Sequence, residues 1–459
     1  MVVLGIQLII QVLLSAVLLL NLVMFMLRKP KAQLAVNILL FSSVLAASAY
    51  AYVLAASSSQ GALSINPFSA IISLLVSSGM ILLNVVASGD AGQYRDFAIL
   101  GSFAAAGMYI VAFAGSLAFL LIGMELMVLP TIMAVLARKS SHIEAAVKLF
   151  VIAAIGAAVL SFAIVLAYGA SGTISFTQAP VVPISAVSMV LFIASLGFEA
   201  SIFPFNMWVP DTYQGSPTYM TAMLGGLNKP IGFVALIETM FLLFSRYSSA
   251  FSAAFYVLAV LTMFYGNLIA LAQKNVKRML AYSSISQAGY MAIALAVASQ
   301  YSLSAIIFYM FAYMLMFIGS MAVVAFMETR NRREISDYTG LLYENRYAAV
   351  TLTIMMLSMA GVPLTAGFVG KYMLFSSAVY SGMMPLALIA ILNSVISVYY
   401  YLKVMMAMFA RKPNPRYMRM QRNLLAVSLI CLALVLVLGL FPNLLATASA
   451  SAASYVVGV

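Results

Sequence analysis

The stretch VVLGIQLIIQVLLSAVLLLNLVMFML, residues 2–27, contains no charged side chain. A helix of about 20 apolar residues crosses the roughly 30 Å of hydrocarbon in a bilayer, so this stretch is long enough to span a membrane. It is too long for the core of a signal peptide, and no basic residue precedes it. We therefore predict a first membrane-spanning helix that stays in the mature protein, rather than a leader that is removed.

Apolar runs of the same kind recur along the chain. Of its 459 residues, 65% are hydrophobic and only 7% are charged. A soluble domain could not keep so much apolar surface out of water. We predict an all-α polytopic membrane protein, forming one transmembrane domain over residues 1–459, with about fourteen helices beginning at roughly residues 4, 32, 66, 96, 116, 144, 184, 219, 249, 278, 302, 347, 384 and 422.

The net charge of +12 comes from basic residues scattered between the predicted helices. These residues follow odd-numbered helices, with Arg246 as the exception, and do not form the single stripe that nucleic acid would need. The positive-inside rule then places the odd loops in the cytoplasm and both termini on the extracytoplasmic side. We expect the membrane to be a prokaryotic cytoplasmic membrane. The basic loop residues that support this topology include Arg28, Arg138, Lys139, Lys277, Lys412 and Arg416.

Two predicted helices contain helix-breaking sequences. The seventh runs into Phe203-Pro204-Phe205, and the twelfth contains Gly361-Val362-Pro363. Proline removes a helical hydrogen bond and clashes with the preceding turn, so both helices should be broken. One broken helix in each half suggests two inverted five-helix repeats of the kind found in transporters. We assign them to residues 95–245 and 246–410, between N-terminal helices in 1–94 and a C-terminal helix in 411–459.

Several ionisable residues lie inside the apolar runs. Each charge at bilayer depth costs roughly 2.5 to 3.5 kcal/mol on insertion scales, so such residues persist mainly where they line a polar path. Titratable groups a few ångströms apart, or bridged by water, can pass protons along such a path. We predict a proton path that uses Glu125, Lys148, Glu199, Lys229 and Lys371, with Lys403 as a further candidate.

Other interpretations remain open for some of these residues. Lys148 follows Glu144 by four residues and could form a local ion pair. Lys403 lies near a helix end, where its side chain could extend to the membrane surface. Glu238 could satisfy a packing hydrogen bond. The single cysteine, Cys431, and the single histidine, His142, cannot build a metal or iron–sulfur site, so we predict no metal and no cofactor in this chain.

The stretch FPFNMWVPDTYQGSPT, residues 203–218, resembles the signature of the antiporter-like subunits of respiratory complex I. Its ending, Tyr-x-Gly-x-Pro-Thr, resembles the version in subunit N. The resemblance extends over roughly residues 95–410 and includes Gly266-Asn267-Leu268, residues 275–280 (NVKRML), residues 282–290 (YSSISQAGY) and residues 360–371 (AGVPLTAGFVGK).

The resemblance implies roles for particular residues. The family's helix-five glutamate falls on Glu125, its helix-six lysine on Lys148, its helix-eight lysine on Lys229 and its helix-twelve lysine on Lys371. The family usually has a lysine in helix seven, where this chain has Glu199. Bacterial relatives often have histidine at the position of Asn206.

The Glu199 difference reverses the local charge. Two carboxyl groups close together would share a proton unless a lysine supplies the countercharge. We expect a retained proton path in which Glu199 carries protons.

The resemblance also implies the function and the partners. It implies a proton-translocating, non-redox subunit of a complex I-like quinone oxidoreductase, driven by electron transfer in other subunits. The partners would be other membrane-arm subunits, the lipid bilayer and protons, with the quinone bound by other subunits and no nucleic acid. A stand-alone cation/proton antiporter and a non-pumping structural spacer remain alternatives. Purification distinguishes the stand-alone antiporter from a subunit of a larger complex. Ion exchange by the single chain in vesicles would favour the antiporter, and co-purification with several membrane and redox subunits would favour the complex.

Overall fold

The architecture is almost entirely helical. A computed structural model describes residues 2–27, 29–54, 58–60, 63–89, 91–136, 143–176, 178–411 and 417–458. Arg28, Arg138, Lys139, His142, Lys412 and Arg416, which entered the predictions of topology and of metal sites, lie outside these residues. The described chain divides into two compact units.

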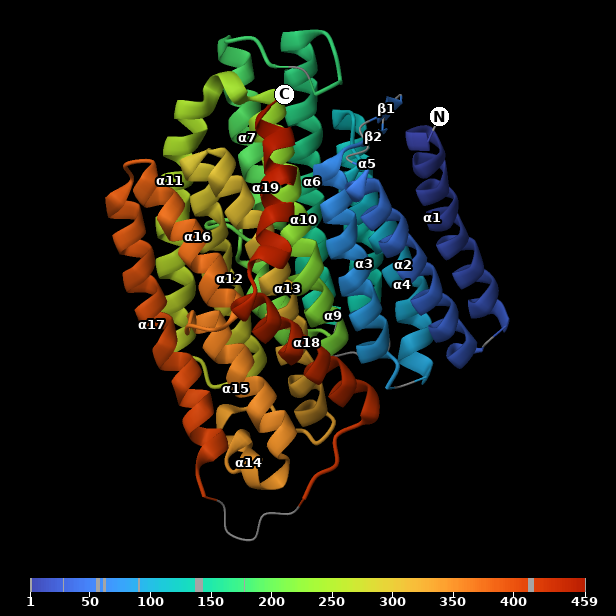
Figure 1. Ribbon diagram of the computed structural model, residues 1–459, viewed down its shortest axis with the longest axis vertical. Coiled ribbons are helices and arrows are strands. Elements are labelled where there is room, and N and C mark those ends of the chain that lie inside the picture. Colours follow the sequence, from blue (N-terminus) through green and yellow to red (C-terminus); the bar gives the residue numbers. More distant parts are fainter. Residues whose placement is uncertain are drawn as a thin grey trace. The chain divides into compact units, whose positions relative to one another are not determined.

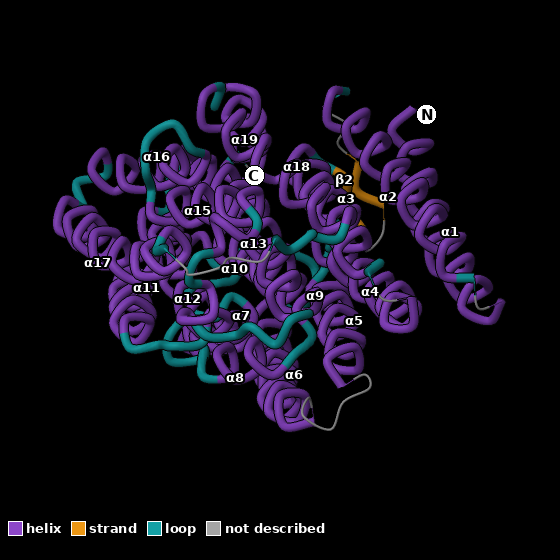
Figure 2. Tube along the Cα trace, turned by 90° about the horizontal axis from the view of Figure 1, so that it is seen from below, coloured by secondary structure: helices purple, strands orange, loops and turns teal. Residues whose placement is uncertain are grey.

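The first unit holds residues up to Ala200, Leu227–Phe251 and the C-terminal residues from Ser451. Its helices α2, α3 and α4 run side by side (Figure 1). The short hairpin of β1 and β2 lies beside α2 and α3 (Figure 2). Its elements are α1 (Val2–Leu27), α2 (Pro30–Val53), β1 (Ser58–Gln60), β2 (Leu63–Ile65), α3 (Pro67–Ala87), α4 (Ala91–Ala112), α5 (Leu117–Leu136), α6 (Ile143–Ser171), α7 (Pro183–Glu199), α10 (Lys229–Glu238), the π-helix η3 (Thr239–Leu243) and the 3₁₀-helix η4 (Ser245–Tyr247).

The second unit holds Ser201–Gly226 and Ser252–Ala450. The long helix α13 lies at its centre and packs against α9, α12, α15, α16 and α18. The elements of this unit are α8 (Trp208–Gly215), α9 (Thr218–Met223), α12 (Val276–Val297), α13 (Gln300–Glu328), η5 (Ile335–Tyr338), α14 (Leu341–Glu344), α15 (Arg346–Ala360), α16 (Ala366–Tyr380), α17 (Met384–Phe409) and α18 (Arg422–Leu440). The π-helix η2 (Leu224–Asn228), α11 (Ser248–Leu271) and α19 (Asn443–Val457) have residues in both units.

Local sequence explains where many helices begin and end. Asn66 accepts a hydrogen bond from the Ser69 amide at 2.8 Å and caps α3, and Asn275 accepts one from the Arg278 amide at 3.0 Å and caps α12. Such caps satisfy amide groups that a helix start leaves free. At the end of α15, Gly361 has a φ of +92°, a conformation that glycine adopts without strain.

Both predicted helix breaks are present. The helix α7 ends at Glu199 and α8 begins at Trp208, while α15 ends at Ala360 and α16 begins at Ala366. Two details differ from the predictions. The small hairpin of β1 and β2 is an addition to the all-α class. We expected one helix in residues 411–459, but α18 and α19 lie there, separated at Pro442, because proline cannot continue the hydrogen-bonding of α18.

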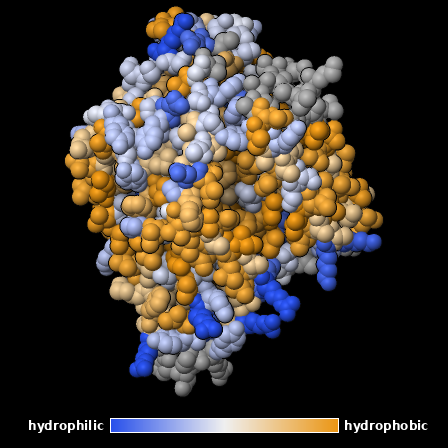
Figure 3. All heavy atoms as spheres, in the orientation of Figure 1, coloured by the Kyte–Doolittle hydropathy of each residue, from blue (hydrophilic) through white to orange (hydrophobic). Residues whose placement is uncertain are grey.

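Eleven helices among the described residues are long and apolar enough to cross a membrane, and three shorter apolar ones accompany them. Hydrophobic residues cover most of the visible face in Figure 3, and strongly hydrophilic residues gather toward its ends. Each predicted helix start lies close to an observed one, but the arrangement as inverted repeats stays a prediction.

Candidate functional site

Glu125 of α5 and Glu199 of α7 line the same small cavity in the first unit. Its volume is about 20 Å³, and Ser195 and Gly156 also contribute to its wall. Glu199 is 8% exposed, while Glu125 is half-buried. A cavity of about 10 to 15 Å³ accommodates one water molecule, so this space can hold a water within reach of both carboxyl groups. The predicted meeting of two carboxyls is therefore geometrically possible.

The helix α10 holds the end of α7 in place through a close backbone approach. A Cβ atom on Gly232 would lie 2.7 Å from the Ala200 amide nitrogen and 2.8 Å from the Glu199 carbonyl carbon. Real Cβ atoms do not come so close, so only glycine allows this contact. The same helix begins at Lys229, which is 1% exposed, less than one turn before Gly232.

Both ends of α10 carry a buried ionisable residue next to a π-helical turn. Lys229 directly follows η2, and Glu238 directly precedes η3. Such turns are rare and often occur at functional sites, because they redirect side chains within a helix. Glu238 is 5% exposed, and its Oε2 atom accepts no hydrogen bond from any described residue. The prediction for Glu238 of a satisfied packing hydrogen bond does not hold for this oxygen.

Lys371 occupies the broken helix of the second unit. Its Nζ atom donates to Ser394 Oγ at 3.0 Å and to the Ala360 carbonyl at 3.3 Å, and lies 4.5 Å from the centre of the Tyr290 ring. Ala360 ends α15, where helix carbonyls are free and the helix dipole favours a cation. The helix break therefore supplies part of the environment of this lysine. A cavity of about 510 Å³ between α16 and α17 reaches the same side chain.

Lys148 and Lys403 have more peripheral environments. Lys148 Nζ lies 2.7 Å from Glu144 Oε1, and their side chains are 42% and 78% exposed. This is the local ion pair that the sequence left open. Lys403 is half-buried and makes a long hydrogen bond of 3.5 Å to the Gln273 carbonyl.

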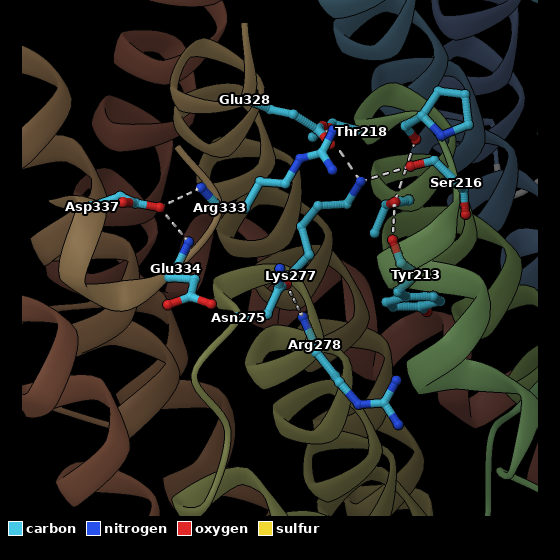
Figure 4. Close-up of polar contacts among 12 residues, drawn as sticks. Tyr213, Ser216, Thr218, Asn275, Lys277, Arg278, Glu328, Arg333, Glu334 and Asp337 are labelled. Atoms are coloured by element: carbon cyan, nitrogen blue, oxygen red, sulfur yellow. Dashed lines mark hydrogen bonds and ion pairs between the residues drawn. The ribbon is translucent and has the colours of Figure 1, made fainter. Parts of the chain in front are cut away.

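The sequence analysis does not predict the ion-pair network around Lys277. The positive-inside rule places Lys277 in a basic loop, but its side chain is 4% exposed and extends between Ser216 and Glu328 (Figure 4). Its Nζ donates to the Ser216 carbonyl at 2.6 Å and lies 3.5 Å from Glu328 Oε2. Thr218 donates to the same oxygen, and Arg333 Nε lies 3.7 Å from Glu328 Oε1. The network joins α9, α12 and α13 in the second unit.

Asn206 lies in the irregular segment before α8. It is fully buried, and neither its Oδ1 nor its Nδ2 has a hydrogen-bond partner among the described residues. Buried amides are normally satisfied by protein or water, and this amide can bind a water through both of its polar atoms.

Comparison with known proteins identifies the family. Residues 114–397 match the family described as "NADH:quinone oxidoreductase/Mrp antiporter, TM". The chain belongs to this family. The match covers Glu125, Lys148, Glu199, Lys229 and Lys371, but it assigns no role to any of them.

Relatives within the antiporter family include subunits of large enzyme complexes. The chain is 36% identical to F420H2 dehydrogenase subunit N of Methanosarcina mazei over 400 residues, which is 83% of this chain and 81% of the relative. It is 37% identical to NADH-quinone oxidoreductase subunit N of Desulforamulus reducens over 362 residues, which is 76% of each chain. Both names agree with the resemblance found in the signature of residues 203–218.

Solved structures of the antiporter family share the fold. A chain of respiratory complex I from Thermus thermophilus, solved with bound aureothin, has a TM-score of 0.86 and 30% identity, covering 96% of this chain and 99% of its own. A chain of the Mrp complex from Dietzia has a TM-score of 0.92 at 21% identity, covering 98% and 97%. The protein is thus an integral multi-pass membrane protein with an antiporter-like fold.

Proposed function

We propose that the chain transfers protons across the membrane as an antiporter-like subunit of a complex I-like quinone oxidoreductase. Its relatives named as subunits N belong to such enzymes, which supports membership of a membrane arm rather than a stand-alone antiporter. In this proposal, other subunits hold the redox cofactors and the quinone. Electron transfer there drives proton movement through this chain.

The cavity between Glu125 and Glu199 carries the proposal. A carboxyl group can accept or release a proton, and a water between two such groups can pass one from the first to the second. Both carboxyl-bearing residues line the same cavity of about 20 Å³. They would share a proton at rest, because two adjacent charges repel each other. Lys229, at the start of α10, and Lys371, in the second unit, are buried lysines that also take part in the transfer.

Replacing Glu199 with glutamine tests this role. The amide keeps the shape of the side chain but cannot take up a proton. We therefore expect proton translocation in energised membrane vesicles to fall sharply, while the assembled complex still reduces quinone. The measurement is the quenching of a pH-sensitive dye, compared with the rate of quinone reduction in the same vesicles.

Glu238→Gln is the matched control. It makes the same change at a buried glutamate of the first unit that does not line the cavity. Translocation should fall less in this variant than in Glu199→Gln. Unchanged translocation in Glu199→Gln, or equal losses in the two variants, would contradict a role specific to the cavity.

A further inference from the structure

One face of α7 carries a row of hydroxyl groups that leads away from Glu199. Ser185, Ser188, Phe192, Ser195 and Glu199 are spaced three and four residues apart, so they lie on one side of the helix. All five are buried. From Glu199 to Ser185 the helix rises about 21 Å, which is most of the distance across the hydrocarbon.

This row lies along the seam between α6 and α7. Ser188 Oγ donates to the Ala163 carbonyl of α6 at 2.8 Å, and Ser195 lines the cavity that contains both carboxyls. Two alanines of α6 contribute to this seam: Ala163 accepts the bond from Ser188, and Ala153 lines the cavity beside Ser195. Ser185 Oγ is fully buried and has no hydrogen-bond partner among the described residues. An unsatisfied hydroxyl in such a place indicates a water that bonds to it.

Phe192 interrupts the row between Ser188 and Ser195. Its ring packs edge-on against Phe244, with 5.7 Å between ring centres, and it is fully buried. An apolar side chain in a narrow polar path stops conduction by excluding water. The far end of the row lies at the start of α7, which is tied to the end of η3 because the Ala179 amide donates to the Leu243 carbonyl at 2.8 Å.

We propose that the seam between α6 and α7 is a proton outlet of the first unit, with Phe192 as its gate. A proton leaves the Glu199 carboxyl, passes through hydrogen-bonded waters and the hydroxyls of Ser195, Ser188 and Ser185, and reaches the side of the membrane where residues 178–182 lie. Each hydroxyl both donates and accepts a hydrogen bond, so it can hand on a proton without being consumed. This proposal rests on the proposed role of Glu199 as a proton carrier. It gives the first unit a separate route by which protons leave the protein.

Passive proton leak tests the gate without relying on pumping. Sealed vesicles that contain the assembled complex, with a trapped pH dye and a clamped membrane potential, are given a pH step in the absence of any electron donor. In Phe192→Ala we expect proton conductance to rise severalfold over the unchanged protein, because water can then enter the row. Adding Ser188→Val should return the leak to the starting level.

Phe41→Ala is the matched control, since Phe41 is an equally buried phenylalanine of α2. It removes the same volume away from the seam, and its leak should stay at the starting level. A leak in Phe192→Ala no larger than in Phe41→Ala, or one that Ser188→Val does not reduce, would overturn the outlet. Because no turnover occurs, that result is distinct from unchanged pumping in Glu199→Gln, which would count against the proposed function.

Thiol accessibility provides a second measurement if a double variant does not assemble. In a Cys431→Ser background, Ser185→Cys and Ser188→Cys should react with Ag⁺ added on the side of residues 178–182. After this treatment their thiols should no longer react with a maleimide. Val187→Cys is the control, because Val187 is 52% exposed on another face of α7. If the cysteines at positions 185 and 188 react no faster than the cysteine of Val187→Cys, the hydrated path is contradicted.

Discussion

Replacing Lys229 with methionine will reduce proton translocation to the background of the vesicles. Lys229 is 1% exposed and begins α10, less than a turn before Gly232, the residue that packs against the Glu199 backbone. Methionine has a similar length and suits an apolar environment, but it cannot take up or release a proton. The fold should therefore persist while the transfer step is lost. Dye quenching in vesicles measures the loss, and native gel electrophoresis confirms that the complex is assembled.

Lys403→Met is the matched control for this prediction. Lys403 is half-buried near the end of α17 and makes a long hydrogen bond of 3.5 Å to the Gln273 carbonyl. If its side chain extends to the membrane surface, translocation should stay close to that of the unchanged protein. Full pumping in Lys229→Met would remove Lys229 from the path. Equal losses in both variants would mean that the number of lysines, rather than their position, determines translocation.

Replacing Lys277 with methionine will strongly destabilise the second unit. The change leaves the Glu328 carboxylate and the Ser216 carbonyl without the ammonium group that lies between them. Removing one partner of a fully buried ion pair costs about 3 to 5 kcal/mol. The loss here should lie toward the lower end of that range, because the Glu328 side chain is 25% exposed and keeps Arg333 Nε at 3.7 Å. We expect a lower temperature at which this subunit is lost from the purified complex. Combining Lys277→Met with Glu328→Gln should recover part of the loss, because no charge is then left alone.

Arg278→Gln provides the comparison one residue further along α12. Arg278 Nη1 lies 2.6 Å from Asp211 Oδ1, but the two side chains are 31% and 34% exposed. Ion pairs that water reaches contribute about 0 to 1 kcal/mol, so this change should have a small effect on the same temperature. A shift in Lys277→Met as small as that in Arg278→Gln would show that the Lys277 network does not stabilise the unit.

The helices and their breaks could be predicted because they depend on local chemistry. Long uncharged stretches such as residues 2–27 must satisfy their backbone within a helix, and Pro204 and Pro363 cannot continue one. The ionisable residues could be singled out for a similar reason, since each is costly in lipid wherever it lies. Local sequence therefore indicated most of the candidate site residues.

The features that were missed depend on packing between distant segments. The turn η2 before Lys229 contains Gly225, where a Cβ atom would lie 2.2 Å from the ring of Phe317. That contact joins residues far apart in the chain, and no local sequence pattern predicts it. The ion pair of Lys277 also joins distant segments. The positive-inside rule assigns Lys277 to a loop, while its partner Glu328 lies at the end of α13. The bond from Ser188 of α7 to the Ala163 carbonyl of α6 likewise depends on how two helices pack together.

A double-mutant cycle on Glu125 and Glu199 tests the central claim most directly, namely that the two carboxyls pass protons as one unit through their shared cavity. Translocation rates are compared among the unchanged protein, Glu125→Gln, Glu199→Gln and the double variant, each assembled in its complex. If one water-bridged relay contains both groups, the double variant will be no slower than the slower single variant, because either change already breaks the relay. If the two fold-losses multiply in the double variant, the carboxyls act independently, and the account is contradicted.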